Sequence, residues 1–210
     1  MENKFKKKKL SASSKAWIKR SQNDIYTKQA QLNNIPCRSY YKLEEIQKKY
    51  NICFKNMFVL DLGSSPGGWS YFFKKYTENI HGCDLLDTME VEIQKFILGD
   101  FTFKDNQKEF IKYNLIVSDM AINTTGNKWM DQCTNNDLNE EVWTFVENHL
   151  LKNGNFVIKI FESEYTNEFL SKIKKKFQKV EKFKPNSSYK SSSEIYIVGK
   201  SFIFHNKDII

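Results

Sequence analysis

Short apolar runs alternate with amphipathic stretches along the chain. Apolar runs of strand length predict strands at 57–62, 80–84, 94–98, 114–118, 154–161 and 194–204, with a further strand at 179–184. Apolar residues at helical spacing predict helices at 39–50, 69–77, 105–112, 136–151 and 164–177. Because strands that alternate with helices form parallel sheets covered on both faces, we predict an α/β fold with a mostly parallel, seven-stranded, Rossmann-like sheet.

The pattern also predicts a loop and the division of the chain into a leader and one domain. Residues 122–136 are rich in Asn and Thr and separate a predicted strand from a predicted helix, so we expect a mobile loop there. The 210 residues are enough for one sizeable core, and we predict one domain over 21–210 behind a basic, flexible leader over 1–20.

A glycine-rich segment, Asp61 to Ser70, joins the first strand to the helix at 69–77. Gly63, Gly67 and Gly68 lack a Cβ, so the backbone there can turn tightly and approach a ligand closely. The following helix offers free N–H groups and the positive end of its dipole. The segment therefore predicts a nucleotide-type pocket.

Three other interpretations of this segment each fail on one residue. A dinucleotide fingerprint starting at Gly63 needs glycine where Ser65 stands, and a phosphate-binding P-loop needs a lysine, which first appears at Lys74. The Gly-x-Ser-x-Gly pattern of serine hydrolases is present, but its oxyanion hole uses the N–H of the residue after the serine. That residue is Pro66, which has no N–H.

The net charge of +8 is unevenly distributed. Residues 1–20 and 171–190 each carry eight Lys or Arg against one Glu, so the rest of the chain is slightly acidic. Aromatic residues lie in and near these segments and could stack on bases: Trp17, Tyr40, Tyr41, Phe177, Phe183 and Tyr189. This favours a polyanionic partner. There are two alternatives: lysine is simply abundant throughout the chain, or Lys6 to Lys9 form a targeting signal.

Membrane and metal functions have little support. No apolar run approaches the ~20 residues of a membrane span, and no signal-peptide core follows the first lysines, so we expect an intracellular protein. The cysteines Cys37, Cys53, Cys83 and Cys133 are far apart and form no Cys-x-x-Cys pair. We expect reduced thiols, no disulfide framework and no metal site.

Acidic residues follow three successive strands. Asp84 stands at the spacing from Gly63 at which a carboxylate accepts hydrogen bonds from ribose hydroxyls. Asp100 could accept the amine of an adenine, and Asp119 ends the strand at 114–118. Each aspartate alone could instead cap the next helix. Three of them around one glycine-rich turn favour a cofactor site.

A second set of charged residues is not explained by a cofactor. Lys159 lies inside an apolar strand, where a lysine is desolvated unless it is paired near the end of the sheet. Such lysines are usually functional. Glu194 begins the last strand and Lys42 lies on the helix at 39–50; taken singly, either could be a solvated charge.

The segments that carry these residues occur in a characteristic order: 38–46, 61–70, 83–86, 99–101, 118–121, 156–161 and 184–196. In this order and over nearly the whole chain, the sequence resembles the FtsJ/RrmJ family of ribose 2′-O-methyltransferases that use S-adenosylmethionine. The resemblance implies a class I methyltransferase fold and a catalytic tetrad of Lys42, Asp119, Lys159 and Glu194. The cofactor site then comprises Gly63, Ser65, Pro66, Gly67, Gly68, Trp69, Asp84, Leu85, Asp100, Phe101 and Asp119, with no metal. One departure is Ile122, where the family commonly has proline.

The resemblance is strongest to the branch that modifies large-subunit ribosomal RNA in bacteria and mitochondria. It implies a monomer that methylates a uridine ribose of ribosomal RNA or the large ribosomal subunit, with cytoplasm, nucleus or organelle left open. Methylation of tRNA or of an mRNA cap is the alternative. A non-catalytic RNA-binding assembly factor would be favoured if a tetrad residue were missing, and none is.

The chemistry requires that the ribose hydroxyl lose a proton. We expect Lys159 to accept it, since burial and the nearby Lys42 favour the neutral amine. Asp119 and Glu194 would hold the two lysine heads. Because these carboxylates also favour a charged lysine, a purely orienting role for Lys159 stays open.

Overall fold

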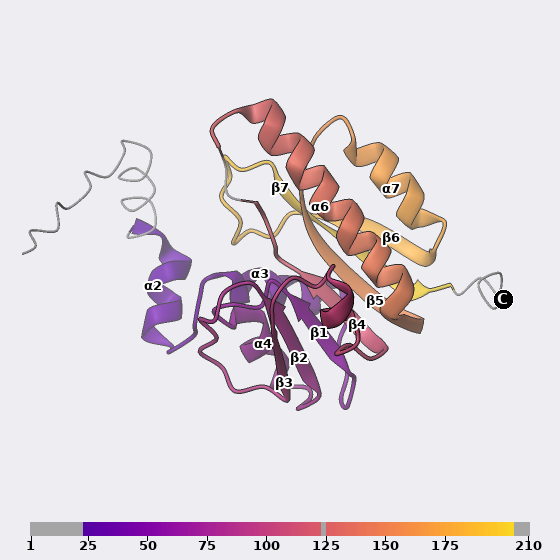
Figure 1. Ribbon diagram of the computed structural model, residues 1–210. Coiled ribbons are helices and arrows are strands. Elements are labelled where there is room, and N and C mark those ends of the chain that lie inside the picture. The colour runs from indigo at the N-terminus through magenta and orange to yellow at the C-terminus, as the bar shows by residue number, and fades with distance from the viewer. Residues whose placement is uncertain (1–22, 123–124, 204–210) are drawn as a thin grey trace, which may run out of the picture.

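The computed structural model describes residues 23–122 and 125–203, and the expected leader at 1–20 lies outside this part (Figure 1). The strands are β1 (Val59–Leu62), β2 (Ile80–Asp84), β3 (Lys95–Leu98), β4 (Tyr113–Ser118), β5 (Leu150–Phe161), β6 (Phe177–Phe183) and β7 (Glu194–Phe202). The helices are α2 (Ile25–Leu32), α3 (Ser39–Tyr50), α4 (Gly68–Phe73), α5 (Lys104–Gln107), α6 (Lys128–His149) and α7 (Thr166–Lys174).

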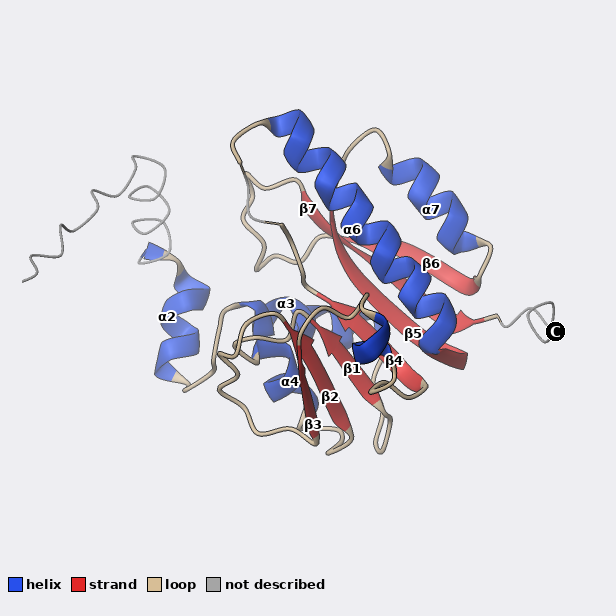
Figure 2. Ribbon diagram, viewed as in Figure 1, coloured by secondary structure: helices blue, strands red, loops and turns tan. Residues whose placement is uncertain are grey.

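In this part of the chain the strands form one seven-stranded sheet with the order β3-β2-β1-β4-β5-β7-β6 (Figure 2). The first five strands run parallel, and β7 is antiparallel to both β5 and β6. The predicted α/β class and the mostly parallel sheet are confirmed. The further strand predicted at 179–184 is present as β6.

Each face of the sheet has its own core. Helices α3 and α4 pack on one face with residues such as Ile46, Phe72 and Val157, and α6 and α7 cover the other with residues such as Trp143 and Phe156 (Figure 1). Successive residues of β5 point to opposite faces because the side-chain period of a strand is two. Lys159 therefore shares the face of Val157, on the side of α3.

The predicted loop at 122–136 is wrong in its second half, because α6 begins at Lys128. The Asn127 side chain caps the helix by accepting hydrogen bonds from the N–H groups of Trp129 (3.1 Å) and Met130 (3.2 Å). Asp131 in the first turn accepts one from the N–H of Thr125 at 2.7 Å. Asn, Asp and Thr favour both loops and helix starts, so composition alone misplaced the boundary.

Other helix boundaries also differ from the pattern. Helix α5 is a single turn instead of the predicted 105–112, and α7 ends at Lys174 because the chain enters β6 at Phe177. Helix α2 was not predicted; Asp24 caps it and forms an ion pair with Arg38 at 3.1 Å. No helix in residues 23–122 or 125–203 is both long and apolar enough to cross a membrane.

Candidate active site

The strand register brings the predicted residues to one edge of the sheet. Leu62 of β1 lies opposite Cys83 of β2 and Ser118 of β4, and Ser118 lies opposite Ile158 of β5. The residues that follow these positions are Gly63, Asp84, Asp119 and Lys159. Parallel strands end on the same side of a sheet, so these residues gather there although they are far apart in sequence.

The glycine-rich turn needs glycine for two reasons. Gly63 and Gly67 have φ angles of +76° and +109°, backbone conformations that residues with a side chain rarely adopt. In addition, a Cβ on Gly63 would lie 2.2 Å from Cγ of Met120, the residue after Asp119. The turn and the end of β4 are therefore in direct contact.

A cavity of about 120 Å³ opens beside this turn, and we call it the loop cavity. Its lining includes Gly63, Ser65, Pro66, Gly68, Trp69 and Asp119 from the expected cofactor set, together with Cys37, Ser39, Asp61 and Ser64. The indole N–H of Trp69 donates to the main-chain oxygen of Ser39 at 2.9 Å, which fixes the start of α3 against α4. The cavity thus lies between the glycine-rich turn, the start of α3 and the end of β4.

The remaining expected cofactor residues do not line the loop cavity. Asp84 supports the turn, since its carboxylate accepts hydrogen bonds from the N–H groups of Ser65 and Leu86, each at 2.9 Å. Asp100 uses one oxygen to accept from the N–H of Thr102 at 2.8 Å, the turn-capping role that an aspartate can also have. Leu85 is 71% exposed.

Gly67 and Phe101, the last of the expected set, have packing contacts instead. Gly67 is the N-cap of α4, and a Cβ there would lie 2.7 Å from Val91. The ring of Phe101 is buried in the core, edge-on to Phe145 at a centroid distance of 5.5 Å.

Asp61 is a site residue that the sequence analysis quoted but gave no role. It is 1% exposed, lines the loop cavity and accepts a hydrogen bond from the Ser70 hydroxyl at 2.8 Å. Burial raises the pKa of Asp61 from 3.8 to about 7, against the hydrogen bond from Ser70, and the charge of Asp119 adds to the rise. An acid at the end of an apolar strand, directly before the glycine-rich turn, was the available signal.

The four residues of the expected tetrad form a chain of three ion pairs. Lys42 Nζ lies 2.8 Å from Glu194 Oε1 and 3.9 Å from Asp119 Oδ1, and Lys159 Nζ lies 3.1 Å from the same Asp119 oxygen. Lys159 also donates to the main-chain oxygen of Asp119. Lys42, Lys159 and Glu194 are each less than a tenth exposed. The structure therefore brings all four together, with Asp119 shared between the tetrad and the loop cavity.

Tyr196 completes this cluster, and the sequence analysis assigned it no role. Its hydroxyl donates to Asp119 Oδ1 at 2.7 Å. Burial alone raises the pKa of Asp119, but the charges of Lys159 and Lys42 and the hydrogen bond from Tyr196 more than offset it, so that pKa lies below its ordinary value. Asp119 is therefore ionised at neutral pH and compensates both lysines.

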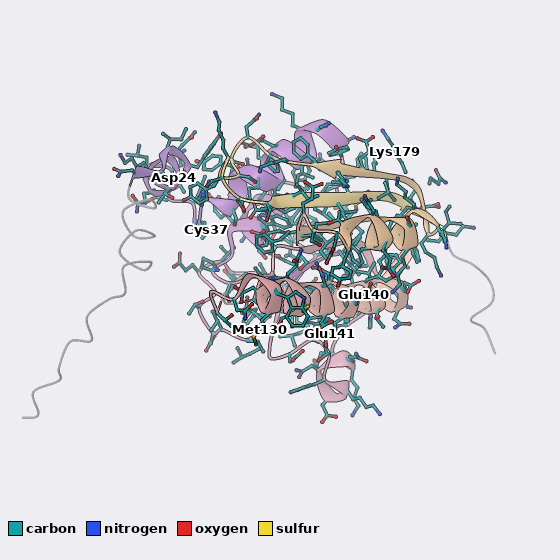
Figure 3. The ribbon with its side chains drawn as sticks, turned by 90° about the horizontal axis from the view of Figure 1, so that it is seen from above. Asp24, Cys37, Met130, Glu140, Glu141 and Lys179 are labelled. Atoms are coloured by element: carbon teal, nitrogen blue, oxygen red, sulfur yellow. The ribbon has the colours of Figure 1, made fainter. Side chains whose placement is uncertain are left out.

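The basic segment at 171–190 lies on α7, β6 and the loop that follows. Several of its lysines already have acidic partners: Lys172 pairs with Glu140, Lys176 with Glu147 and Lys182 with Glu162. Figure 3 shows Lys179 at the opposite end of the molecule from Cys37, which lines the loop cavity. Much of this positive charge is thus neutralised locally or distant from the cavity.

Fold and site together define a Rossmann-like methyltransferase. Among the residues that the structure describes, no cluster of three or more His, Cys, Asp or Glu could hold a metal ion. The FtsJ-like methyltransferase model matches residues 35–202, and the chain belongs to this family.

Relatives cover most of the chain. Ribosomal RNA large subunit methyltransferase E from Pelagibacter ubique is 39% identical over 194 residues, which is 89% of this chain and 96% of that protein. The protein of the same name from Francisella philomiragia is 36% identical over 200 residues, 91% of this chain and 97% of that one. Among solved structures, a protein from Plasmodium falciparum described as a ribosomal RNA methyltransferase has 29% sequence identity to this chain. It superposes with a TM-score of 0.71 and covers 81% of this chain and 100% of that one.

The raised pKa of Asp61 predicts a pH-dependent stability. Above pH 3.8 the unfolded chain releases this proton, whereas the folded chain keeps it until about pH 7. The free energy of unfolding of the wild type, relative to Asp61→Asn, should therefore fall by about 4 kcal/mol as the pH rises from about 4 to 7, and then level off. Urea unfolding of both proteins across this range measures the difference, and a flat difference would contradict the assignment.

Proposed function

We propose that the protein transfers a methyl group from S-adenosylmethionine to a ribose 2′-hydroxyl of large-subunit ribosomal RNA, with a uridine as the target. One observation carries the proposal: two buried lysines and two carboxylates meet beside a cavity formed by the glycine-rich turn. Methyl transfer to an alcohol requires a bound methyl donor and a group that aligns and deprotonates the hydroxyl. The loop cavity and the tetrad supply one place for each.

The residues around the turn suit the cofactor. Gly63 and Gly68 line the loop cavity without a Cβ, and the cavity borders the buried carboxylate of Asp61. We assign Asp61 and Asp119 to the amino-acid end of S-adenosylmethionine, Asp84 to its ribose, and Asp100 with Leu85 and Phe101 to its adenine region. When bound, the cofactor supplies an activated methyl group.

The tetrad would handle the acceptor hydroxyl. Lys159, as the neutral amine after loss of its own proton, is the group we propose to take the proton of the hydroxyl. Asp119, Tyr196 and Glu194 hold the two lysine side chains in place. Lys42, paired with Glu194, would orient the hydroxyl toward the methyl donor. The four side chains of the tetrad already lie within ion-pair distance of one another, so no rearrangement is needed to bring them together.

The RNA class is supported by the relatives. Both Pelagibacter ubique and Francisella philomiragia proteins are named for the large ribosomal subunit, and each aligns over nearly its full length. We therefore propose ribosomal RNA or the large subunit as the partner. We also propose that the enzyme is monomeric and intracellular and acts without metal. Methylation of tRNA or of an mRNA cap is the second candidate. Mapping 2′-O-methylation on total RNA after loss of the protein distinguishes these substrates.

Replacement of Lys159 should separate methylation from RNA binding. Lys159→Ala should lower the single-turnover rate of methyl transfer by about 10²- to 10⁴-fold, the usual contribution of a positioned acid–base group, with cofactor affinity nearly intact. The rate is measured with radiolabelled S-adenosylmethionine and saturating RNA. Undiminished transfer by Lys159→Ala would exclude the proposed role.

Lys159→Arg is the control that separates a base from an orienting charge. A guanidinium stays protonated and cannot accept the proton, so full activity of Lys159→Arg would exclude proton abstraction.

Asp84→Ala should weaken S-adenosylmethionine binding by about 1.5 to 3 kcal/mol, because hydrogen bonds to a charged group are removed. Isothermal titration calorimetry measures the affinity. Asp84 also accepts hydrogen bonds from the N–H groups of Ser65 and Leu86, which shape the turn. Asp84→Asn is the control for this structural role, because it removes the charge but keeps one acceptor oxygen. Unchanged affinity in Asp84→Ala would remove this residue from the cofactor site.

The charge of the 171–190 segment makes a distinct prediction for RNA affinity. Lys174 and Lys175 are exposed and have no ion pair within the described chain. A double variant with Lys174→Gln and Lys175→Gln should therefore reduce the salt dependence of RNA affinity. The slope of log affinity against log salt should fall by roughly 0.7 for each RNA phosphate that is no longer neutralised. Lys172→Gln with Lys176→Gln is the matched control and should change it less, since Glu140 and Glu147 already neutralise these lysines. Equal salt slopes in all three proteins would place these lysines outside the RNA interface.

A further inference from the structure

The segment between β6 and β7, residues 184–193, is held against α3 and is called the β6–β7 loop below. Glu45 accepts hydrogen bonds from the N–H groups of Asn186 (2.7 Å) and Ser187 (2.9 Å). Arg38 donates to the main-chain oxygen of Ser187, and its guanidinium lies 3.9 Å from the ring centroid of Tyr189. A charged side chain of each sign thus fixes the backbone of this loop.

The two anchoring residues flank a tetrad residue. Arg38, Lys42 and Glu45 are separated by four and three positions, which places them on one face of the helical turn. The face of α3 that holds the β6–β7 loop is therefore the same face that presents Lys42 to the site. The position of the loop is tied to the position of the tetrad.

Ser188 provides the direct contact between the loop and the tetrad. Its hydroxyl donates to Glu194 Oε1 at 2.7 Å, and Lys42 Nζ lies 2.8 Å from the same oxygen and 2.9 Å from Oε2. Ser188 is 5% exposed and Glu194 is 9% exposed. A buried carboxylate that accepts from two sides has little rotational freedom, so both donors determine its orientation.

We propose that Ser188 is a positioning residue for methyl transfer: its hydroxyl orients Glu194, and Glu194 in turn holds the Lys42 ammonium toward Asp119. This inference rests on the proposed function, because it names what sets the geometry of the same site. Ser188 does not line the loop cavity, and its hydroxyl donates to Glu194. We therefore expect its contribution to pass through Glu194.

The neighbouring serine offers a matched control. Ser187 is fully buried in the same loop, and its hydroxyl has no hydrogen-bond partner among the described residues. Ser187→Ala and Ser188→Ala each remove one buried hydroxyl oxygen, and the two positions are adjacent. Only Ser188→Ala removes a hydrogen bond to Glu194. A difference between the two alanine variants therefore reports orientation rather than packing.

Single-turnover methyl transfer at saturating RNA and cofactor tests the proposal in three variants. Ser188→Ala should lower the rate by about 10- to 100-fold, as expected for one hydrogen bond to a charged group, with unchanged cofactor affinity. Ser188→Thr keeps a hydroxyl and should retain most of the rate, and Ser187→Ala should match the wild type. A wild-type rate in Ser188→Ala, or equal losses in both alanine variants, would overturn the proposal.

A double-mutant cycle with Glu194→Ala provides a readout that does not need RNA. Ser188→Ala should shift the urea midpoint of the otherwise wild-type protein but cause a clearly smaller shift in the Glu194→Ala background. Equal shifts in both backgrounds would overturn the positioning role. If the wild type methylates no ribosomal RNA, the proposed function fails, whereas the coupling between Ser188 and Glu194 is still measured by unfolding.

Discussion

Mutual compensation of buried charge is the constraint on which this site depends. Lys42 and Lys159 are almost excluded from water, and an uncompensated ammonium in such a place would cost several kcal/mol. Glu194 and Asp119 offset this cost only because they lie within ion-pair distance. Loss of any one of the four weakens the charge compensation of the others, so local stability at these positions depends on the whole set.

The reversed last strand makes this compensation possible. In the antiparallel pair of β5 and β7, Lys159 lies opposite Tyr196 and Phe161 lies opposite Glu194. Cross-strand neighbours on one face are close enough for their side chains to meet a common partner. Lys159 and Tyr196 accordingly both reach Asp119 at the end of β4, and Glu194 reaches Lys42 from the start of β7. The sheet topology thus brings the ends of three strands, β4, β5 and β7, together at one edge, where Lys42 of α3 meets them.

Much of this arrangement follows from the sequence because its signals are local. Strand-length apolar runs, the glycine-rich turn and a lysine within the apolar strand β5 each stand out by themselves, and the resemblance then identified Lys42 and Glu194. The residues that stayed without a role act through long-range contacts. Tyr196 and Ser188 look like ordinary strand and loop residues until folding places them on Asp119 and Glu194. The start of α6 was misplaced because Asn127 and Asp131 belong to residue types shared by loops and helix starts.

The hydrogen bonds of Asp84 have a consequence for how the pocket is filled. By holding the backbone of Ser65 and Leu86, this carboxylate shapes the turn through contacts within the chain itself. A ligand that enters such a preorganised pocket does not have to order the loop, so little conformational entropy is lost on association. The turn then acts as a preformed template that selects ligands by fit.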